Sequence, residues 1–214
     1  MSPQKIILND LIDRYPILIQ CKENIWNAYE LIGISYEQNG KLLIAGNGGS
    51  AADSEHIVGE LMKGFVKHRY LDDDMKSKLM AVDEEIGVSL CKSLQGALPA
   101  IALTGHMALS TAFLNDVDGT LGFAQQVFGY GTNNDVFMGI TTSGNSKNIL
   151  NAMVVARAKD MKTIALTGNT GGKVRLMADV SIVVPETETY KIQELHLPIY
   201  HALCLMLEDR FFDV

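Results

Sequence analysis

The sequence has little that would suit a disulfide scaffold, a membrane span or a nucleic-acid binder. Its 214 residues include three cysteines without CxxC spacing, as expected of reduced thiols in a cytoplasmic protein. No apolar run approaches the roughly 20 residues of a transmembrane helix, and the N-terminal MSPQKIILND lacks the basic start and apolar core of a signal peptide. The net charge of −7 argues against nucleic acid as a partner.

A short apolar run, a glycine loop and a helix follow one another around residue 50. Lys41–Ala45 has the character of a buried strand, Gly46–Gly49 allows a tight reversal, and Ser50 is the expected N-cap of the helix. His56 and Glu60 are four residues apart and share one face of that helix, a spacing that suits a metal site or a proton-transfer pair. The alternative is a packing turn followed by an exposed polar pair.

Later apolar runs predict the rest of a sheet. Each has the composition of a buried parallel strand, and helical patterns such as Lys147–Lys159 lie between them: Leu98–Thr104, Asp135–Thr142, Lys162–Gly168 and Val180–Pro185. The alternation predicts an α/β fold with a doubly wound, five-stranded parallel sheet flanked by helices. Ligands of such sheets bind at the carboxyl ends of the strands.

Two segments lie outside this pattern. Residues 3–39 have helical apolar spacing, and Pro16 is expected to divide them into two helices. Such an N-terminal extension, residues 1–40, has no sheet of its own to cover, so its apolar face is predicted to mediate oligomerisation. The α/β domain then comprises residues 41–214. The acidic segment Lys67–Glu85 is expected to be a solvated connection or a lid.

The loop Thr141–Ser146, with the sequence TTSGNS, follows a predicted strand and precedes a predicted helix. Its hydroxyls, its asparagine and the free N–H groups of the helix start suit a phosphate, although an elaborate N-cap would use the same residues. The loop Thr167–Lys173 has a similar composition, but its glycines could serve the turn alone.

The last predicted helix, from about Thr187 to Phe212, contains further polar candidates. Gln193 and His201 lie within about 80° of each other, two turns apart, whereas His196 points elsewhere. Pro198 is a possible kink. Each histidine alone could be a core or interface residue, but the His56 and Glu60 pair favours a functional role for His201.

AGNGGSAAD, the helix with His56 and Glu60, TTSGNS and IQELH together resemble the sugar isomerase (SIS) family, in particular its phosphoheptose branch. The resemblance implies a flavodoxin-like SIS domain with one zinc ion per subunit, held by His56, Glu60, Gln193 and His201. It implies an acid/base pair formed by Glu60 and His201. It places substrate contacts at Asn47, Gly48, Gly49, Ser50, Glu60, Asn115, Asp116, Thr141, Thr142, Ser143, Ser146 and Gln193.

The activity implied is the conversion of sedoheptulose 7-phosphate to D-glycero-D-manno-heptose 7-phosphate, by a homotetramer with active sites at subunit interfaces. Such an isomerisation needs a base beside the carbonyl, an acid at its oxygen and stabilisation of an enediol. Because a ligating carboxylate is a poorer base, a structural zinc is an alternative to a catalytic one. The rival is a non-catalytic SIS protein that binds a phosphosugar or the replication initiator. The presence of both Glu60 and His201 favours the enzyme.

Overall fold

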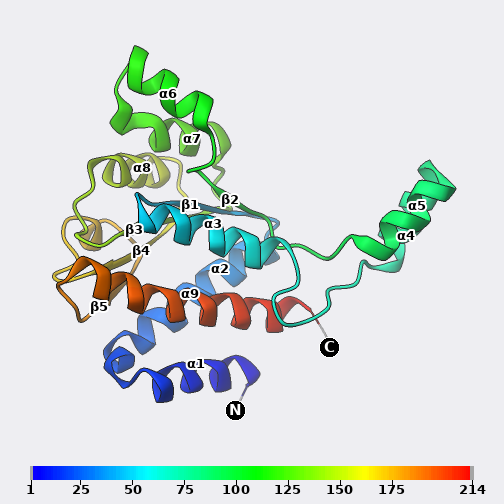
Figure 1. The fold of residues 1–214 in the computed structure, drawn as a ribbon, viewed down its shortest axis with the longest axis horizontal. Coiled ribbons are helices and arrows are strands. Elements are labelled where there is room, and N and C mark those ends of the chain that lie inside the picture. Colours follow the sequence, from blue (N-terminus) through cyan, green and yellow to red (C-terminus); the bar gives the residue numbers. More distant parts are fainter. Residues whose placement is uncertain (1, 213–214) are drawn as a thin grey trace.

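The computed structural model describes residues 2–212 and contains a five-stranded, all-parallel sheet in the order β2-β1-β3-β4-β5 (Figure 1). The order changes direction between β1 and β3, the switch point at which such sheets bind ligands. The predicted doubly wound sheet is therefore confirmed. Its strands are β1 (Leu42–Ala45), β2 (Ala100–Ala102), β3 (Val136–Thr141), β4 (Lys162–Gly168) and β5 (Val180–Val184).

Helices cover both faces of the sheet (Figure 1). Alternate residues of β1 enter different cores: Leu42 and Ile44 join one, Leu43 and Ala45 the other. The first face carries α1 (Pro3–Arg14), α2 (Lys22–Glu37), α3 (Gly49–Met62) and α9 (Thr189–Phe211). The second carries α7 (Gly122–Tyr130) and α8 (Lys147–Ala158), with α6 (Met107–Asp116) beyond α7. Short 3-10 helices occupy Pro16–Cys21, Gly119–Leu121 and Val174–Leu176.

The N-terminal segment divides at Pro16 as predicted, because α1 ends at Arg14 and a 3-10 turn leads into α2. The expectation that this segment covers no sheet is wrong. Helix α2 packs against β3, β5 and α9, and α1 packs along α9. The buried residues of both helices, including Leu11 and Ile25, belong to the same core as the sheet. Their inner faces are therefore used within the chain.

Two helices form an arm that extends away from the sheet (Figure 1): α4 (Asp73–Val82) and α5 (Glu84–Ser93). They pack mainly on each other, and no residue of α4 is buried. The predicted solvated connection is thus exposed but helical, because the side chains of Asp72 and Asp83 accept N–H groups as N-caps. Arg69, by contrast, is buried, with 1% of its surface exposed.

Helix α9 is 23 residues long and continues through Pro198. It crosses the first face beside α1, α2 and α3, so it brings the C-terminal candidates to the glycine-loop helix. Nowhere in residues 2–212 does a helix combine the length and apolarity that crossing a membrane requires.

Candidate active site

The glycine loop turns directly from β1 into α3. Gly48 is the N-cap residue and has a φ of 55°, a left-handed conformation that glycine adopts without a Cβ penalty. The helix begins at Gly49, so the expectation that Ser50 is the N-cap is wrong. Ser50 instead lies buried in the first turn, where its carbonyl oxygen accepts a hydrogen bond from the Ser54 hydroxyl, 2.8 Å away.

His56 and Glu60 meet on one face of α3, as their spacing predicted. Nε2 of His56 lies 3.2 Å from Oε1 of Glu60, and Nζ of Lys63 lies 3.1 Å from Oε2 of the same carboxylate. The Glu60 side chain is only 13% exposed, whereas that of His56 is 42% exposed. A mostly covered carboxylate between an imidazole and an ammonium group is suited to exchanging a proton.

His201 joins this pair from α9. Its ring centroid lies 5.1 Å from that of His56, and the ring packs against Phe65 and Tyr200. Burial, followed by the neighbouring His56, lowers the pKa of His201, while Glu60 opposes the shift. His201 is therefore neutral near pH 7 and can both donate and accept a proton.

Tyr200 and Asp53 form a chain behind His56 that the sequence motifs did not reveal. The Tyr200 hydroxyl donates to Oδ1 of Asp53 at 3.3 Å and lies 3.0 Å from Nδ1 of His56. Burial and then the Asp53 carboxylate raise the pKa of Tyr200, so its hydroxyl stays protonated. Because that proton is used on Asp53, the oxygen can accept Nδ1–H of His56, a contact that fixes the orientation of the imidazole ring.

Gln193 lies against the start of α3. A Cβ at Gly49 would come within 2.6 Å of its Nε2, so glycine allows this close approach. The side chain of His196 points into the core, fully buried, as the helical angle predicted. The structure therefore places Gln193 at the glycine loop and keeps His196 out of the site.

The TTSGNS loop forms at the carboxyl end of β3. Oγ of Ser146 lies 2.9 Å from Oγ1 of Thr141, and the Ser143 hydroxyl accepts the N–H of Asn145 at 3.2 Å. Ser146 occupies the N-cap position of α8 but makes no side-chain cap, so these hydroxyls do not form the elaborate N-cap considered above. Thr142 accepts Gly168 N–H through its carbonyl oxygen.

The second glycine-rich loop supports the first. Gly144 has a φ of 67°, and a Cβ there would collide with the carbonyl of Gly171. Val174 N–H donates to the Gly144 carbonyl, and Lys173 N–H donates to the side-chain oxygen of Asn145. The glycines of Thr167–Lys173 therefore serve close packing between two loops.

Asn148, which sequence reasoning missed, joins the glycine loop to α8. Its side-chain amide and that of Asn47 exchange two hydrogen bonds, of 3.0 and 2.8 Å. This pair bridges the β1 and β3 loops at the switch point of the sheet. Only the three-dimensional structure identifies it, because the two residues are 101 positions apart.

The Asn115 and Asp116 pair lies apart from this cluster. Nδ2 of Asn115 donates to Oδ1 of Asp116 at 2.7 Å, and both are exposed at the end of α6. That helix packs on α7 and the adjoining 3-10 turn, on the opposite face of the sheet from α9 (Figure 1). No contact in the described part of the chain joins the pair to Glu60 or His201.

The proposed metal ligands are only partly assembled. Across residues 2–212, no three His, Cys, Asp or Glu side chains are arranged to hold a metal ion. Two observations nevertheless fit one. Nε2 of His201 is buried and has no hydrogen-bond partner among the described residues. Nε2 of His56 lies 3.2 Å from Oε1 of Glu60, so the two atoms are close enough to share a proton or a cation.

Comparisons with known proteins agree with this arrangement. The SIS domain family matches residues 77–168, which places the chain among the SIS-domain proteins. A phosphoheptose isomerase of Thermodesulfovibrio yellowstonii is 37% identical over 185 residues, 86% of this chain and 79% of the relative. The chain belongs to the phosphoheptose isomerase family and is a sugar-phosphate isomerase.

Solved structures of two phosphoheptose isomerases resemble the whole chain. The protein from Neisseria gonorrhoeae is 33% identical, with a TM-score of 0.69, over 94% of this chain and 92% of that one. The protein from Francisella tularensis is 31% identical, with a TM-score of 0.71, over 97% and 99%. The predicted SIS fold is therefore confirmed.

Proposed function

We propose that the chain converts sedoheptulose 7-phosphate to D-glycero-D-manno-heptose 7-phosphate through an enediol. The observation that carries this proposal is the covered Glu60 carboxylate beside His56 and His201, on the helix α3 that begins at the β1/β3 switch point. An aldose–ketose isomerisation needs such a base and a neutral proton donor. Relatives named phosphoheptose isomerase support the choice of sugar.

In this proposal Glu60 removes the proton next to the carbonyl, and His201 delivers a proton to the carbonyl oxygen. The hydroxyls of Thr142, Ser143 and Ser146, with the N–H groups at the start of α8, receive the phosphate at the positive end of the helix dipole. Asn47 and Gly48 line the sugar from the other side of the switch point.

Glu60→Gln tests the base, because the amide keeps the shape of the side chain but cannot accept the proton. We expect turnover of sedoheptulose 7-phosphate to fall by at least about 100-fold, the lower end of a general-base contribution. Wild-type product made in heavy water should carry deuterium at the carbon next to the carbonyl.

Glu55→Gln is the matched control, since Glu55 is an exposed carboxylate on the same helix. Glu55 accepts a hydrogen bond from the hydroxyl of Thr104. The Glu55→Gln variant should keep wild-type turnover. Wild-type protein inactive on this sugar would refute the substrate assignment, and a Glu60→Gln variant with near wild-type turnover would refute the base.

Zinc forms the second part of the proposal, with His56, Glu60, His201 and Gln193 as its ligands. Two imidazoles, a carboxylate and an amide oxygen are a chemically suitable set. The unpartnered Nε2 of His201 and the closeness of His56 Nε2 to the Glu60 carboxylate support it. When bound, zinc would polarise the sugar oxygens as a Lewis acid.

Elemental analysis of protein purified without chelator should find close to one zinc per chain. His56→Ala should lose the metal, because it removes the ligand that Tyr200 orients. His68→Ala is the control, since His68 is exposed and stacks on Tyr70 outside the site. Equal metal content in wild type and His56→Ala would remove His56 from the ligand set.

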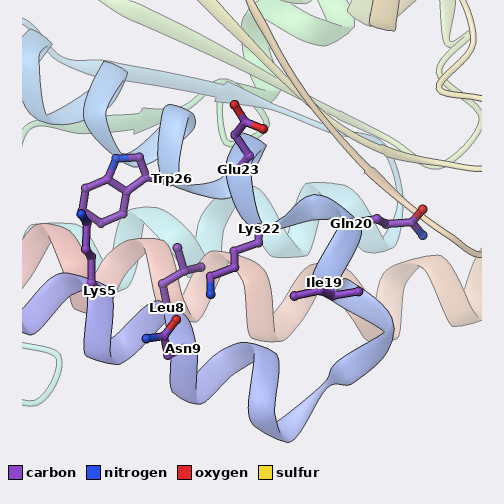
Figure 2. Close-up of a pocket in the computed structure, with 8 residues that line it drawn as sticks. All are labelled: Lys5, Leu8, Asn9, Ile19, Gln20, Lys22, Glu23 and Trp26. Carbon is purple, nitrogen blue, oxygen red and sulfur yellow. The ribbon is translucent and has the colours of Figure 1, made fainter. Parts of the chain in front are cut away.

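The homotetramer forms the third part. A groove of about 620 Å³ between α1 and the start of α2 is lined in part by Leu8, Ile19 and Trp26 (Figure 2). Ile19 is 59% exposed and Ile6, on α1, is 57% exposed. Apolar side chains left exposed on helices whose other faces are buried support the contact between subunits that we propose for residues 1–40.

Light scattering should show a tetramer at micromolar concentration. Ile19→Glu should shift the tetramer toward dimers or monomers, because it places a charge in the groove. Val154→Glu is the control, since Val154 is 54% exposed on α8, which covers the opposite face of the sheet from α1 and α2. A wild-type monomer would refute the tetramer and, with it, active sites at subunit interfaces.

A further inference from the structure

The loop between α3 and the arm is held by a buried ion pair. The Glu208 carboxylate, near the end of α9, accepts the backbone N–H groups of Phe65, Val66 and Lys67 at 2.8, 3.0 and 3.2 Å. It also accepts Nε of Arg69 at 2.9 Å, and both side chains are completely buried. The N–H groups and the guanidinium outweigh burial and lower the pKa of Glu208, so it is ionised at neutral pH.

The same guanidinium caps the helix that carries Glu60. Arg69 donates from one terminal nitrogen to the carbonyl of Leu61 at 2.6 Å and from the other to the carbonyl of Glu60 at 2.9 Å. Carbonyls in the last turn of a helix have no partner within the helix. A charged, planar donor that bridges two of them fixes the backbone from which the Glu60 side chain projects.

Glu208 also acts on His201. It follows His201 by seven residues, about two helical turns, so the two side chains project from the same side of α9. Glu208 holds the N–H of Phe65, and the ring of Phe65 packs on His201 with centroids 5.5 Å apart. The ion pair thus contacts the backbone of Glu60 and the backbone of Phe65, whose ring packs on His201.

We infer that Arg69 and Glu208 are positioning residues that set Glu60 and His201 relative to each other. This inference rests on the isomerase mechanism proposed above. It goes beyond that mechanism because neither side chain contacts the reacting atoms. Arg69 reaches Glu60 through the end of α3, and Glu208 reaches His201 through Phe65.

The attraction between the two buried charges adds little net stability by itself. Exchanging a buried ion pair for apolar residues of similar volume is often neutral or stabilising, whereas removing one partner leaves an unpaired buried charge. The double variant Arg69→Met/Glu208→Leu therefore separates the two roles. It removes both charges together and with them the caps on α3 and on the loop.

We expect the double variant to fold with a lower melting temperature than the wild type, because the backbone groups that the two side chains bonded lose these partners. Its kcat should fall by about 10- to 100-fold, the cost of displacing catalytic groups by about 1 Å, with KM changed less than about threefold. Arg210→Met is the matched control. Arg210 lies on the same helix and pairs with Glu30 and Glu37, away from the loop, so kcat should not change.

Wild-type kcat in the double variant would overturn the inference. If that variant does not fold, Arg69→Lys provides the test, because lysine keeps the charge for Glu208 but lacks the fork that reaches both carbonyls. Its kcat should also fall, and a wild-type value would again overturn the inference.

A crystal structure of the folded variant gives a readout independent of the substrate. Glu60 should move away from His56, and Phe65 should leave His201. Unchanged positions would refute positioning even if wild-type protein were inactive on sedoheptulose 7-phosphate, a result that by itself would refute only the proposed substrate.

Discussion

Replacing His196 by leucine should remove a pH dependence of stability that this residue gives the wild type. His196 is fully buried in α9, and neither ring nitrogen has a well-formed hydrogen bond within residues 2–212. Burial lowers the pKa of His196 to about 4, although the backbone of Thr167 opposes the shift. The ring is therefore neutral in the folded protein throughout the neutral range.

The direction of this pH dependence follows from the pKa of His196 in the folded and the unfolded protein. In the unfolded chain a histidine has a pKa of about 6.5, so between pH 6.5 and 4 the unfolded state binds more protons. The stability contribution of neutral His196 is complete above pH 6.5 and disappears as the pH falls toward 4. Since each pKa unit corresponds to about 1.4 kcal/mol, the loss is on the order of 3 kcal/mol.

Urea unfolding of wild type and His196→Leu, at one protein concentration and at several pH values from 4 to 7.5, measures this term. The difference between the proteins should shift by about 3 kcal/mol in favour of the variant at the acid end. Other titrating groups are common to both proteins and cancel. His106→Leu, at an exposed histidine, is the control. Parallel curves for wild type and His196→Leu would refute the reasoning.

Three further outcomes are expected. Tyr200→Phe should weaken zinc binding by about 10- to 100-fold without unfolding, because it frees Nδ1 of His56; unchanged affinity in a chelator competition would contradict this. Gly144→Ala should raise the KM for phosphosugar and lower the melting temperature, because its Cβ collides with Gly171; a wild-type KM would contradict it. Replacing residues 72–94 by a short glycine linker should leave the monomer fold intact by circular dichroism, because Arg69 O and Gly96 N already join the base of the arm.

Much of the fold could be predicted because its signals are local. The bounds of β4 are as predicted, since a continuous apolar run ends there at glycine. The division at Pro16 follows from the missing N–H of proline. The pairing of His56 and Glu60 also followed, because helical periodicity fixes which side chains share a face. The resemblance, rather than the periodicity, predicted that His201 joins them.

What could not be predicted depends on contacts between distant segments. Arg69 lies in a charged stretch that suggests solvent, yet it is buried because Glu208, 139 residues later, supplies a carboxylate. Asn148 and Tyr200 belong to no motif and act through Asn47 and His56. The cap at Gly48 was missed because serine is also a strong N-cap residue, and only the backbone angle decides between them.

The glycines of the loop after β1 serve two purposes: some allow close packing of α3, and one leaves open space at the loop. A Cβ at Gly46 would collide with the carbonyl of Ser50, and one at Gly49 would come within 2.6 Å of the Gln193 amide. These two glycines therefore let α3 lie close to β1 and α9. A Cβ at Gly48 would meet nothing within 4 Å, so this residue alone leaves open space at the loop. The active site that we propose depends on both effects, because α3 carries Glu60 toward His201 only if the two helices approach, and the proposed sugar site uses the space that remains.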